Sequence, residues 1–428
     1  IQVFRENLRQ LLMQAPLTGK TVLGWDPAFR TGCKIAVVDP TGKVLDTTVV
    51  FPTAPQNRVE EAMRTIEALI RKHHVDVISL GNGTASRESE QIIADYIKKD
   101  HLPVQYVIVN EAGASVYSAS ALATEEFPNF DVGQRSATSM ARRLQDPMAE
   151  LVKIDPQSIG VGQYQHDMNQ TKLSEQLTSV VEDSVNSVGV DVNTASFALL
   201  SYVSGINKTI ARNIVTYREE KGAFTSRKEL LKVAKLGPKA YEQCAGFLRI
   251  RNGKEALDNT AVHPESYAVA KAVLASMGYA EEDLQDGKNA QLAAKLQSAK
   301  ASIPALAEQL QVGVYTLEDI VQELIKPGRD PREDVPAPVL RSDVLDFDDL
   351  KPEMELQGTV RNIVDFGAFV DIGVHQDGLV HISQLADRFV KHPLDVVKVG
   401  DIVRVRVLSV DKARKKISLT MKGVDQHH

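Results

Sequence analysis

Strict alternation of apolar and polar residues near the C-terminal end of the sequence constrains the fold most. Between residues 403 and 407 valines alternate with arginines, and between residues 416 and 421 Ile417, Leu419 and Met421 alternate with polar residues. This period of two is typical of antiparallel strands with one buried face. Residues 358–372 supply two more strand-like pieces, and residues 378–383 supply a third. Five short strands in about 65 residues predict a small closed barrel, because a sandwich usually needs more strands.

The same stretch resembles the OB-fold RNA-binding repeat of the ribosomal small-subunit protein S-one. The matching residues are Gly358, Val360, Phe366–Val370, Gly378–Ser383, Val399–Asp401 and Ile417–Lys422. The resemblance implies that Phe366, Phe369 and His381 gather on one barrel face, where their rings stack on unpaired bases. It also implies phosphate contacts by three basic residues: Arg361, Lys398 and Arg404. The alternative is that the two phenylalanines belong to the barrel core.

Length and composition describe an ordinary globular chain of two to four domains, since 428 residues can build several cores. No apolar run approaches the roughly 20 residues that a membrane-spanning helix needs. The first residues are neither a signal peptide nor a natural initiator, so we expect a chain cut in mid-helix. Cys33 and Cys244 have no Cys or His partners at metal-binding spacing. This indicates neither a disulfide framework nor a zinc site, and we expect a reducing cytoplasm. No metal site and no cofactor are predicted for the chain.

The charge is unevenly distributed along the chain. The formal net charge is −6, which argues weakly against bulk binding to nucleic acid. However, residues 201–254 contain 12 Lys and Arg against 4 Asp and Glu, whereas residues 330–349 are acidic and rich in proline. We expect phosphate to bind in the basic region.

The N-terminal third has the pattern of an α/β domain. Strands are predicted at residues 21–26, 33–39 and 44–51, with a turn at Pro40–Lys43. Helical and strand patterns then alternate, with strands at 75–80 and 104–109. Three antiparallel strands followed by alternating helices and strands are the order of the ribonuclease H-like fold. The pattern also resembles the YqgF subgroup of that fold.

Nucleases of this fold use several carboxylates to hold Mg²⁺, which activates water and stabilises the reacting oxygens. Asp26, at the end of the first strand, and Glu111, after the strand that ends at Val109, are the candidates. Asn82 stands where many such nucleases carry an acid, and the later helix offers Arg135 instead of a carboxylate. We therefore expect no catalysis, with the two acids as remnants in a polar groove; an active nuclease is the alternative.

Several segments together resemble the Tex family of bacterial transcription accessory proteins, which is more distantly similar to the eukaryotic elongation factor Spt-six. The segments are 24–34, 81–88, 110–120, 151–167 and 181–193. The resemblance covers nearly the whole chain and implies that an N-terminal helical portion is missing. Within these segments His166 and Asp167 suggest a metal site, but a lone pair more often has a hydrogen-bonded structural role.

Two helix-hairpin-helix candidates follow at residues 203–209 and 233–239, as the Tex resemblance also implies. The motif normally has two glycines around one apolar residue, so that backbone N–H groups face a phosphate. Each copy keeps one glycine, Gly205 or Gly237; Asn207 replaces the other in the first copy, because Asn tolerates left-handed geometry. The side chains expected to add contacts are Lys208, Thr209, Arg212 and Lys239. The alternative is that the paired hairpins are an internal packing unit.

These patterns predict a multidomain chain with α/β, all-α and all-β parts. The expected parts are the end of a preceding helical region (1–19), a YqgF or ribonuclease H-like domain (20–150), a helix-hairpin-helix region (151–255), a small helical domain (256–330), an acidic Pro-rich linker (331–350) and an S-one-type OB barrel (351–422). Pro327–Arg332 marks the start of the linker, which would let the barrel move.

The favoured function is a non-catalytic transcription accessory factor that binds single-stranded RNA or DNA, and duplex as a further candidate. RNA polymerase or the ribosome is the expected protein partner, and no membrane is involved. Two alternatives remain: a Mg²⁺-dependent nuclease or resolvase built on Asp26 and Glu111, and a structural adaptor for the transcription or translation machinery. The missing acids argue against the first, and the basic hairpins with the aromatic barrel argue against the second.

Overall fold

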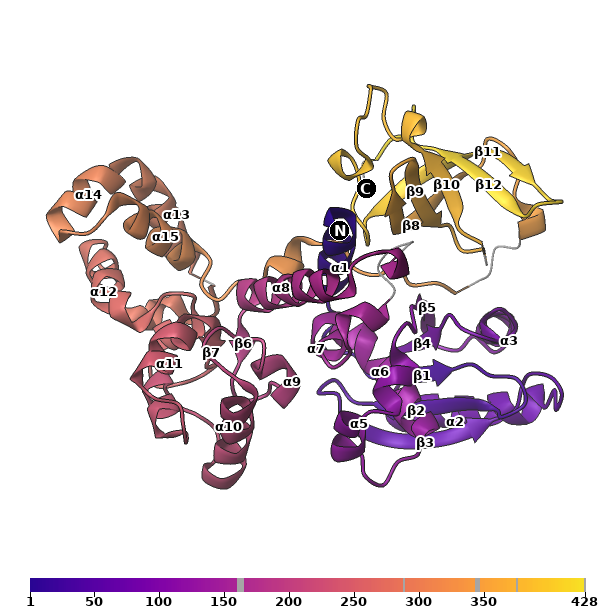
Figure 1. Ribbon diagram of the computed structural model, residues 1–428, viewed down its shortest axis with the longest axis horizontal. Coiled ribbons are helices and arrows are strands. Elements are labelled where there is room, and N and C mark those ends of the chain that lie inside the picture. The colour runs from indigo at the N-terminus through magenta and orange to yellow at the C-terminus, as the bar shows by residue number, and fades with distance from the viewer. Residues whose placement is uncertain (160–164, 288, 343–346, 375, 427–428) are drawn as a thin grey trace. The chain divides into compact units, whose positions relative to one another are not determined.

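The chain divides into two units in the computed structural model, which describes residues 1–159, 165–287, 289–342, 347–374 and 376–426 (Figure 1). One unit comprises residues 1–180 and 334–428, and the other comprises residues 181–333. The first unit holds an α/β domain and a barrel, and the second is mainly helical.

A five-stranded sheet organises the α/β domain of the first unit. Its strands are β1 (Val22–Asp26), β2 (Cys33–Val38), β3 (Val44–Val50), β4 (Val77–Gly81) and β5 (Gln105–Val109), in the order β3-β2-β1-β4-β5. The pairs β3–β2 and β2–β1 are antiparallel, and β1–β4 and β4–β5 are parallel. This is the ribonuclease H-like order that the sequence predicts.

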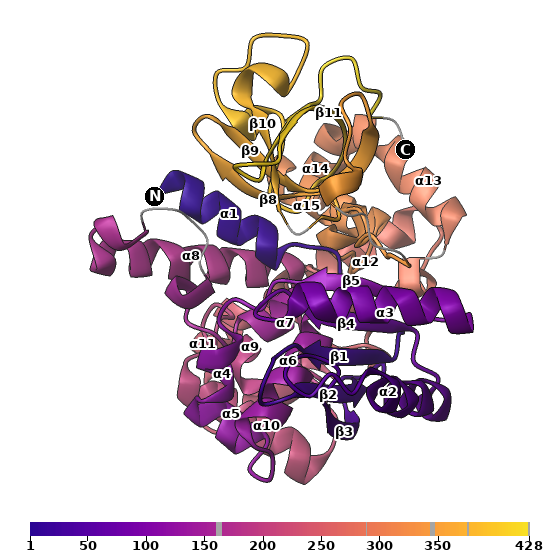
Figure 2. The same cartoon turned by 90° about the vertical axis from the view of Figure 1, so that its right-hand side faces the viewer.

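Both faces of the sheet are covered by helices (Figure 2). Leu23 and Trp25 face a core that includes residues of α2 (Val59–His73) and α3 (Ser86–Asp100). Val22 faces the opposite side, where α6 (Val132–Gln145) packs. Gly24 permits this close packing, because a Cβ on it would lie 2.2 Å from the carbonyl oxygen of Ala137. The remaining helices here are α4 (Ala114–Ser118), α5 (Ala121–Glu126) and α7 (Pro147–Leu151).

The outer edge of β5 pairs with a residue of the segment expected to be a linker. Tyr106 and Arg341 exchange two backbone hydrogen bonds, of 2.8 and 2.9 Å, as an antiparallel bridge. The segment from 331 to 350 is therefore tied to the sheet at residue 341.

The five C-terminal strands, yellow in Figure 1, close into a barrel, as the sequence predicts. They are β8 (Glu355–Val364), β9 (Gly367–Asp371), β10 (Gly378–His381), β11 (Ile402–Asp411) and β12 (Lys416–Thr420), in the order β10-β12-β11-β8-β9. The predicted alternation is confirmed: Val405, Val407 and Leu419 are buried in the barrel core, and β11 and β12 are antiparallel. Helix α1 (Gln2–Leu12) packs its Leu11 against this core.

The second unit begins within α8 (Gln170–Val188) and contains two similar helical hairpins. The hairpins comprise α9 (Phe197–Leu200), α10 (Lys208–Lys221), the 3₁₀ helix η3 (Arg227–Lys232) and α11 (Pro238–Cys244). Two short parallel strands, β6 (Val190–Asp191) and β7 (Leu248–Arg249), join the two ends of this region.

A helical bundle completes the second unit. Its helices are α12 (Tyr267–Ser276), α13 (Ala290–Ala299), α14 (Ile303–Leu310) and α15 (Val314–Ile325). Leu317, Ile320, Val321 and Leu324 of α15 lie in its core. The other short 3₁₀ segments are η1 (Pro156–Ile159), η2 (Gln165–Asp167), η4 (Ala245–Phe247), η5 (Ala256–Asn259), η6 (Pro264–Ser266), η7 (Glu281–Gly287), η8 (Lys300–Ser302), η9 (Pro331–Asp334), η10 (Phe347–Asp349), η11 (Ile382–Gln384) and η12 (Pro393–Asp395).

Candidate nucleic-acid interface

Three ring side chains of the barrel lie together at the β9–β10 hairpin. His381 pairs with Gly367 across the hairpin, and the backbone N–H of Ile382 donates to the carbonyl of Phe366 at 2.8 Å. The rings of Phe366 and Phe369 meet edge to face, with centroids 6.3 Å apart. Phe366 is 48% exposed and the His381 side chain is exposed. Both rings are therefore accessible from the solvent.

The imidazole of His381 is held in one orientation. Its Nδ1 accepts a hydrogen bond from the backbone N–H of Ser383 at 3.2 Å and lies 2.9 Å from the Ser383 hydroxyl. When the ring is neutral, the proton therefore sits on Nε2. A fixed ring loses little freedom on stacking, and an exposed N–H can donate to a base or a phosphate.

The three basic residues expected to contact phosphate have different surroundings. Arg361 on β8 donates to the carboxylate of Asp371 at 2.8 Å, and Arg404 on β11 lies 3.7 Å from a carboxylate oxygen of Glu355. Lys398 is exposed in the turn before β11. Since β12 or β8 separates β11 from the β9–β10 hairpin, Arg404 does not join the ring cluster.

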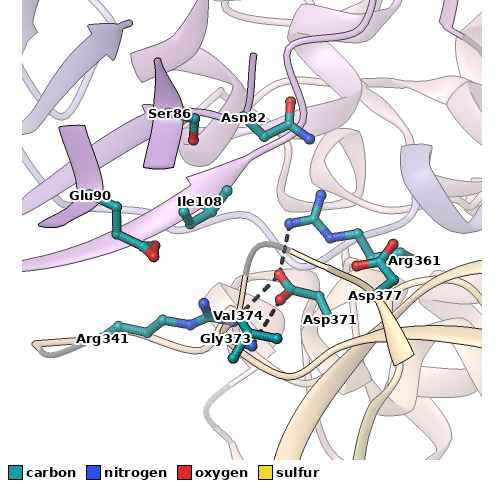
Figure 3. A pocket seen from close by; sticks show the side chains of 10 residues that line it. All are labelled: Asn82, Ser86, Glu90, Ile108, Arg341, Arg361, Asp371, Gly373, Val374 and Asp377. Carbon is teal, nitrogen blue, oxygen red and sulfur yellow. Dashed lines mark hydrogen bonds and ion pairs between the residues drawn. The ribbon is translucent and has the colours of Figure 1, made fainter. Parts of the chain in front are cut away.

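Arg361 lines a pocket of about 220 Å³ between the α/β domain and the barrel (Figure 3). The Asp371 carboxylate also lies 3.5 Å from Arg341 and accepts from the backbone N–H of Gly373. Burial would raise the pKa of Asp371, but Arg361 and Arg341 hold that pKa below its usual value. The Arg361 guanidinium thus has a carboxylate partner within the protein.

Phe389 is an exposed aromatic residue of the barrel that sequence reasoning missed. It lies between η11 and η12 and is 88% exposed. It falls in a loop, where no strand period distinguishes an exposed ring from a buried one. The only available signal was an aromatic residue flanked by Arg388 and Lys391.

The two candidate carboxylates of the α/β domain come together at the carboxyl ends of β1 and β5. Burial raises the pKa of Asp26, although Ser136 donates to its carboxylate and Lys34 is close. Burial and then the charge of Asp26 raise the pKa of Glu111, while the N–H of Gly83 donates to it. The charge of Asp26 thus acts on Glu111, as expected for two carboxylates that lie near each other.

Of the two residues expected in place of metal-binding acids, Asn82 lies beside the carboxylates and Arg135 does not. Asn82 Oδ1 accepts from the backbone N–H of Glu111 at 3.1 Å, so Asn82 supports the loop that carries Glu111. The prediction that Arg135 occupies the place of a metal-binding acid is wrong. Its buried guanidinium donates to the carbonyls of Phe127 and Ser118, because the next residue of α6, Ser136, is the one that faces Asp26.

Within the ranges that the structure covers, no three His, Cys, Asp or Glu side chains are grouped so that they could hold a metal ion. This includes His166 and Asp167, which lie in η2. The same ranges contain no helix long and apolar enough to span a bilayer.

The turns of the two hairpins have the same backbone hydrogen bonds, offset by 30 residues. The N–H groups of Val203 and Ile206 donate to the carbonyls of residues 200 and 203, and those of Val233 and Leu236 donate to residues 230 and 233. Gly205 has φ +84° and Lys235 has φ +65°, so the first glycine position is left-handed in both copies. Two residues later, the N-cap residue of the following helix, Asn207 or Gly237, has an extended backbone in both copies.

The reason given above for Asn207 is wrong, because this residue is not left-handed. It has φ −88° and ψ 177°, and its side chain caps α10 by accepting from the N–H of Ile210 at 2.8 Å. Gly237 occupies the same position with φ −88° and ψ −176°. Asn is favoured there as an N-cap.

The hairpins pack against each other and still expose their polar side chains. A Cβ on Gly205 would lie 2.7 Å from Cβ of Gln243 in α11, and Asn213 Nδ2 of α10 donates to the carbonyl of Ala234 at 2.8 Å. The expected contact residues are exposed: Asn207, Lys208, Thr209, Gly237 and Lys239. Arg212 lies over the ring of Phe197, with its guanidinium carbon 4.2 Å from the ring centroid. Packing and binding are therefore compatible.

Family models match this chain in four successive segments. They are a Tex protein YqgF-like domain at residues 20–145, a helix-hairpin-helix motif at 185–249, an HHH domain at 255–332 and an S1 RNA binding domain at 349–422. The order and positions of these matches agree with the α/β domain, the hairpins, the helical bundle and the barrel.

Curated relatives match along nearly the whole chain. Uncharacterized protein YdcI of Bacillus subtilis is 57% identical over 98% of this chain and 58% of its own length. Protein tex of Bordetella pertussis is 53% identical over 99% of this chain and 52% of its own length. Transcriptional accessory protein Tex of Neisseria gonorrhoeae is 52% identical over 100% of this chain and 55% of its own length.

The chain spans about half the length of these relatives. Within that span the domain order, the hairpins and the closed barrel all agree with the family models. The chain belongs to the Tex family and carries its YqgF-like, helix-hairpin-helix and S1 domains.

Proposed function

We propose that this chain is the nucleic-acid-binding part of a transcription accessory factor and that it has no catalytic activity of its own. The observation that carries the proposal is the cluster of Phe366, Phe369 and His381 on a closed barrel, with Phe366 and His381 exposed and Phe369 half-buried. Aromatic rings bind single strands of any sequence, because every base has a face to stack on. The match to an RNA binding domain favours single-stranded RNA as the ligand of the barrel.

The hairpins supply a second contact in this proposal. Lys208 and Lys239 are exposed at the starts of α10 and α11, the helix ends that favour an anion. Such contacts recognise the phosphate backbone and carry no sequence information. A duplex or a single strand would therefore bind there mainly through charge.

A salt series separates the two contacts. Phe369→Ala or His381→Ala removes stacking worth about 1–3 kcal/mol per base, so affinity for single-stranded RNA should fall while the salt slope is unchanged. Lys208→Ala with Lys239→Ala should flatten the slope of log affinity against log salt by roughly 0.7–0.9 per lost contact. Tyr315→Ala, which removes a ring that is 83% exposed in the helical bundle, is the control. If the barrel variants bind single-stranded RNA and DNA like the parent, the proposal fails.

One observation favours a nuclease as the second candidate function. Asp26 lies close enough to Glu111 for its charge to help raise the pKa of Glu111. We nevertheless expect no cleavage of flaps, junctions or hybrids in Mg²⁺ or Mn²⁺, because two acids are few for a two-metal site. Turnover that disappears in Asp26→Asn would establish the nuclease instead.

We infer RNA polymerase or the ribosome as the protein partner and the cytoplasm as the compartment. The printed name of the Neisseria gonorrhoeae relative, a transcriptional accessory protein, supports the first partner. Binding of the chain to purified RNA polymerase and to ribosomes, measured with and without RNA, tests this inference. Binding to neither would overturn it.

A further inference from the structure

A segment at the second hairpin alternates between buried and exposed residues with a period of three. Arg227, Leu230, Val233 and Leu236 are each at most 3% exposed. Residues 227–232 form the 3₁₀ helix η3, in which residues three apart lie above one another. The other side of the segment carries exposed side chains, here called the basic stripe: Lys228, Leu231, Lys232 and Lys235.

The basic stripe stands on a rigid base. The guanidinium of Arg227 is fully enclosed and donates to the carbonyls of Leu248 and Val262 and to the hydroxyl of Tyr267, the last two at 2.7 Å. The carboxylate of Glu229, the acid within the segment, accepts from the backbone N–H and the hydroxyl of Thr225 and also lies near Lys232. The stripe is thus held in place before any ligand binds.

The first hairpin lacks this feature, although its turn has the same backbone hydrogen bonds and the same left-handed position. With the offset of 30 residues, Lys228, Leu231, Lys232 and Lys235 correspond to Ala198, Ser201, Tyr202 and Gly205. None of these four is charged, and Ala198 is buried. The stripe therefore is a property of the second copy and is not needed to build a hairpin.

Lys235 stands in a conformation that favours glycine. Its φ is +65°, whereas the corresponding residue of the first copy, Gly205, has φ +84°. A side chain is disfavoured in this region because its Cβ crowds the backbone. An exposed cation kept at a strained position suggests a use for the charge.

We propose that the basic stripe binds the phosphate backbone of a polynucleotide beside the second hairpin, with Leu231 against a sugar or base edge. The inference rests on the proposed function and extends it, because it makes the two hairpins unequal. A strand that reaches both hairpins is held by more cations at the second. Leu231 is 46% exposed and adds apolar contact between the lysines.

Lys235→Gly is the sharpest test, because it removes the charge and relieves the backbone strain together. The variant should unfold at the same temperature as the parent or higher, yet the slope of log affinity against log salt should flatten by roughly 0.7–0.9. Lys228→Ala, Lys232→Ala and Lys235→Gly combined should flatten the slope by roughly 2–3. Lys235→Arg keeps the charge and should bind like the parent, as should Lys326→Ala, a control that removes an exposed lysine at the end of α15.

Single-stranded RNA, single-stranded DNA and duplex are titrated in parallel, so that the preferred form is read directly. Leu231→Ala should weaken binding several-fold without changing the slope. If the combined variant keeps the parent's slope on all three ligands while Lys208→Ala with Lys239→Ala flattens it, the stripe is not a contact and the proposed function stands. If the parent binds none of the three, both fail.

Discussion

The carboxylate of Glu111 occupies the space that a side chain at Gly83 would need. A Cβ on Gly83 would lie 1.7 Å from Oε1 of Glu111. Gly83→Ala must therefore displace Glu111 or the loop, and we expect a loss of about 1–3 kcal/mol in the free energy of unfolding, as in other overpacked sites. Urea denaturation of the parent and the variant measures this difference in the free energy of unfolding. Gly246→Ala is the matched control, because its nearest neighbour would be 3.7 Å away, and its stability should stay within about 0.5 kcal/mol of the parent.

The contribution of Asp26 and Glu111 to stability should rise as the pH falls from neutral through their raised pKa values. Burial raises both values, so the folded state takes up protons before the unfolded chain does. Asp26→Asn removes this charge and should stabilise the protein at pH 7, because burial disfavours the charged carboxylate. The gain should shrink toward pH 4. Thermal unfolding from pH 4 to 8 checks both points, and a variant less stable than the parent at pH 7 would contradict them.

The barrel should fold as a separate fragment from Leu350, because Leu350 is part of its core and the closed sheet leaves no open edge. We expect dispersed amide signals in an NMR spectrum of residues 350–422. A fragment that extends to residue 426 should be more stable, because Val424 is buried and Gln426 exchanges hydrogen bonds of 2.9 and 2.8 Å with the backbone of Arg404. Equal unfolding temperatures of the two fragments would show that these last contacts contribute nothing.

Asp371→Asn should destabilise the first unit, because it leaves Arg361 and Arg341 without their shared carboxylate. The side chains are 10–23% exposed, so we expect about 1–3 kcal/mol, below the loss for a fully buried pair. Glu355→Gln, whose side chain is 42% exposed beside Arg406, should change stability by less than about 1 kcal/mol. Thermal unfolding at low and high salt distinguishes the two. Similar small effects in both variants would mean that the Asp371 pairs are solvent-screened.

The sequence predicts best the elements in which apolar and polar residues repeat at a regular spacing along a short stretch of chain. The alternation of Val405 and Val407 with arginines determines which face of β11 is buried, so the barrel follows from the residues themselves. The strands ending at Asp26 and Val109 are likewise apolar runs of strand length. Asp26 and Glu111 then meet because β1 and β5 are both parallel to β4 in one sheet.

Other features depend on choices that a sequence pattern does not encode. One residue of register in α6 decides whether Arg135 or Ser136 faces Asp26. The hairpin motif shows two glycine positions but not which of them is left-handed, so the role of Asn207 was misread. Arg361 looks like a phosphate ligand until the fold brings Asp371, ten residues away in sequence, beside it.

The bridge between Tyr106 and Arg341 also bears on how this protein avoids aggregation. β5 is the last strand on its side of the sheet, and an edge strand offers unpaired N–H and C=O groups to any other extended chain. Arg341 pairs with that edge at Tyr106, although more than 200 residues of chain separate it from β5. During synthesis the edge stays open until the second unit has been made. A chain that stops before residue 341 would keep β5 uncovered, and intermolecular strand pairing would compete with its correct folding.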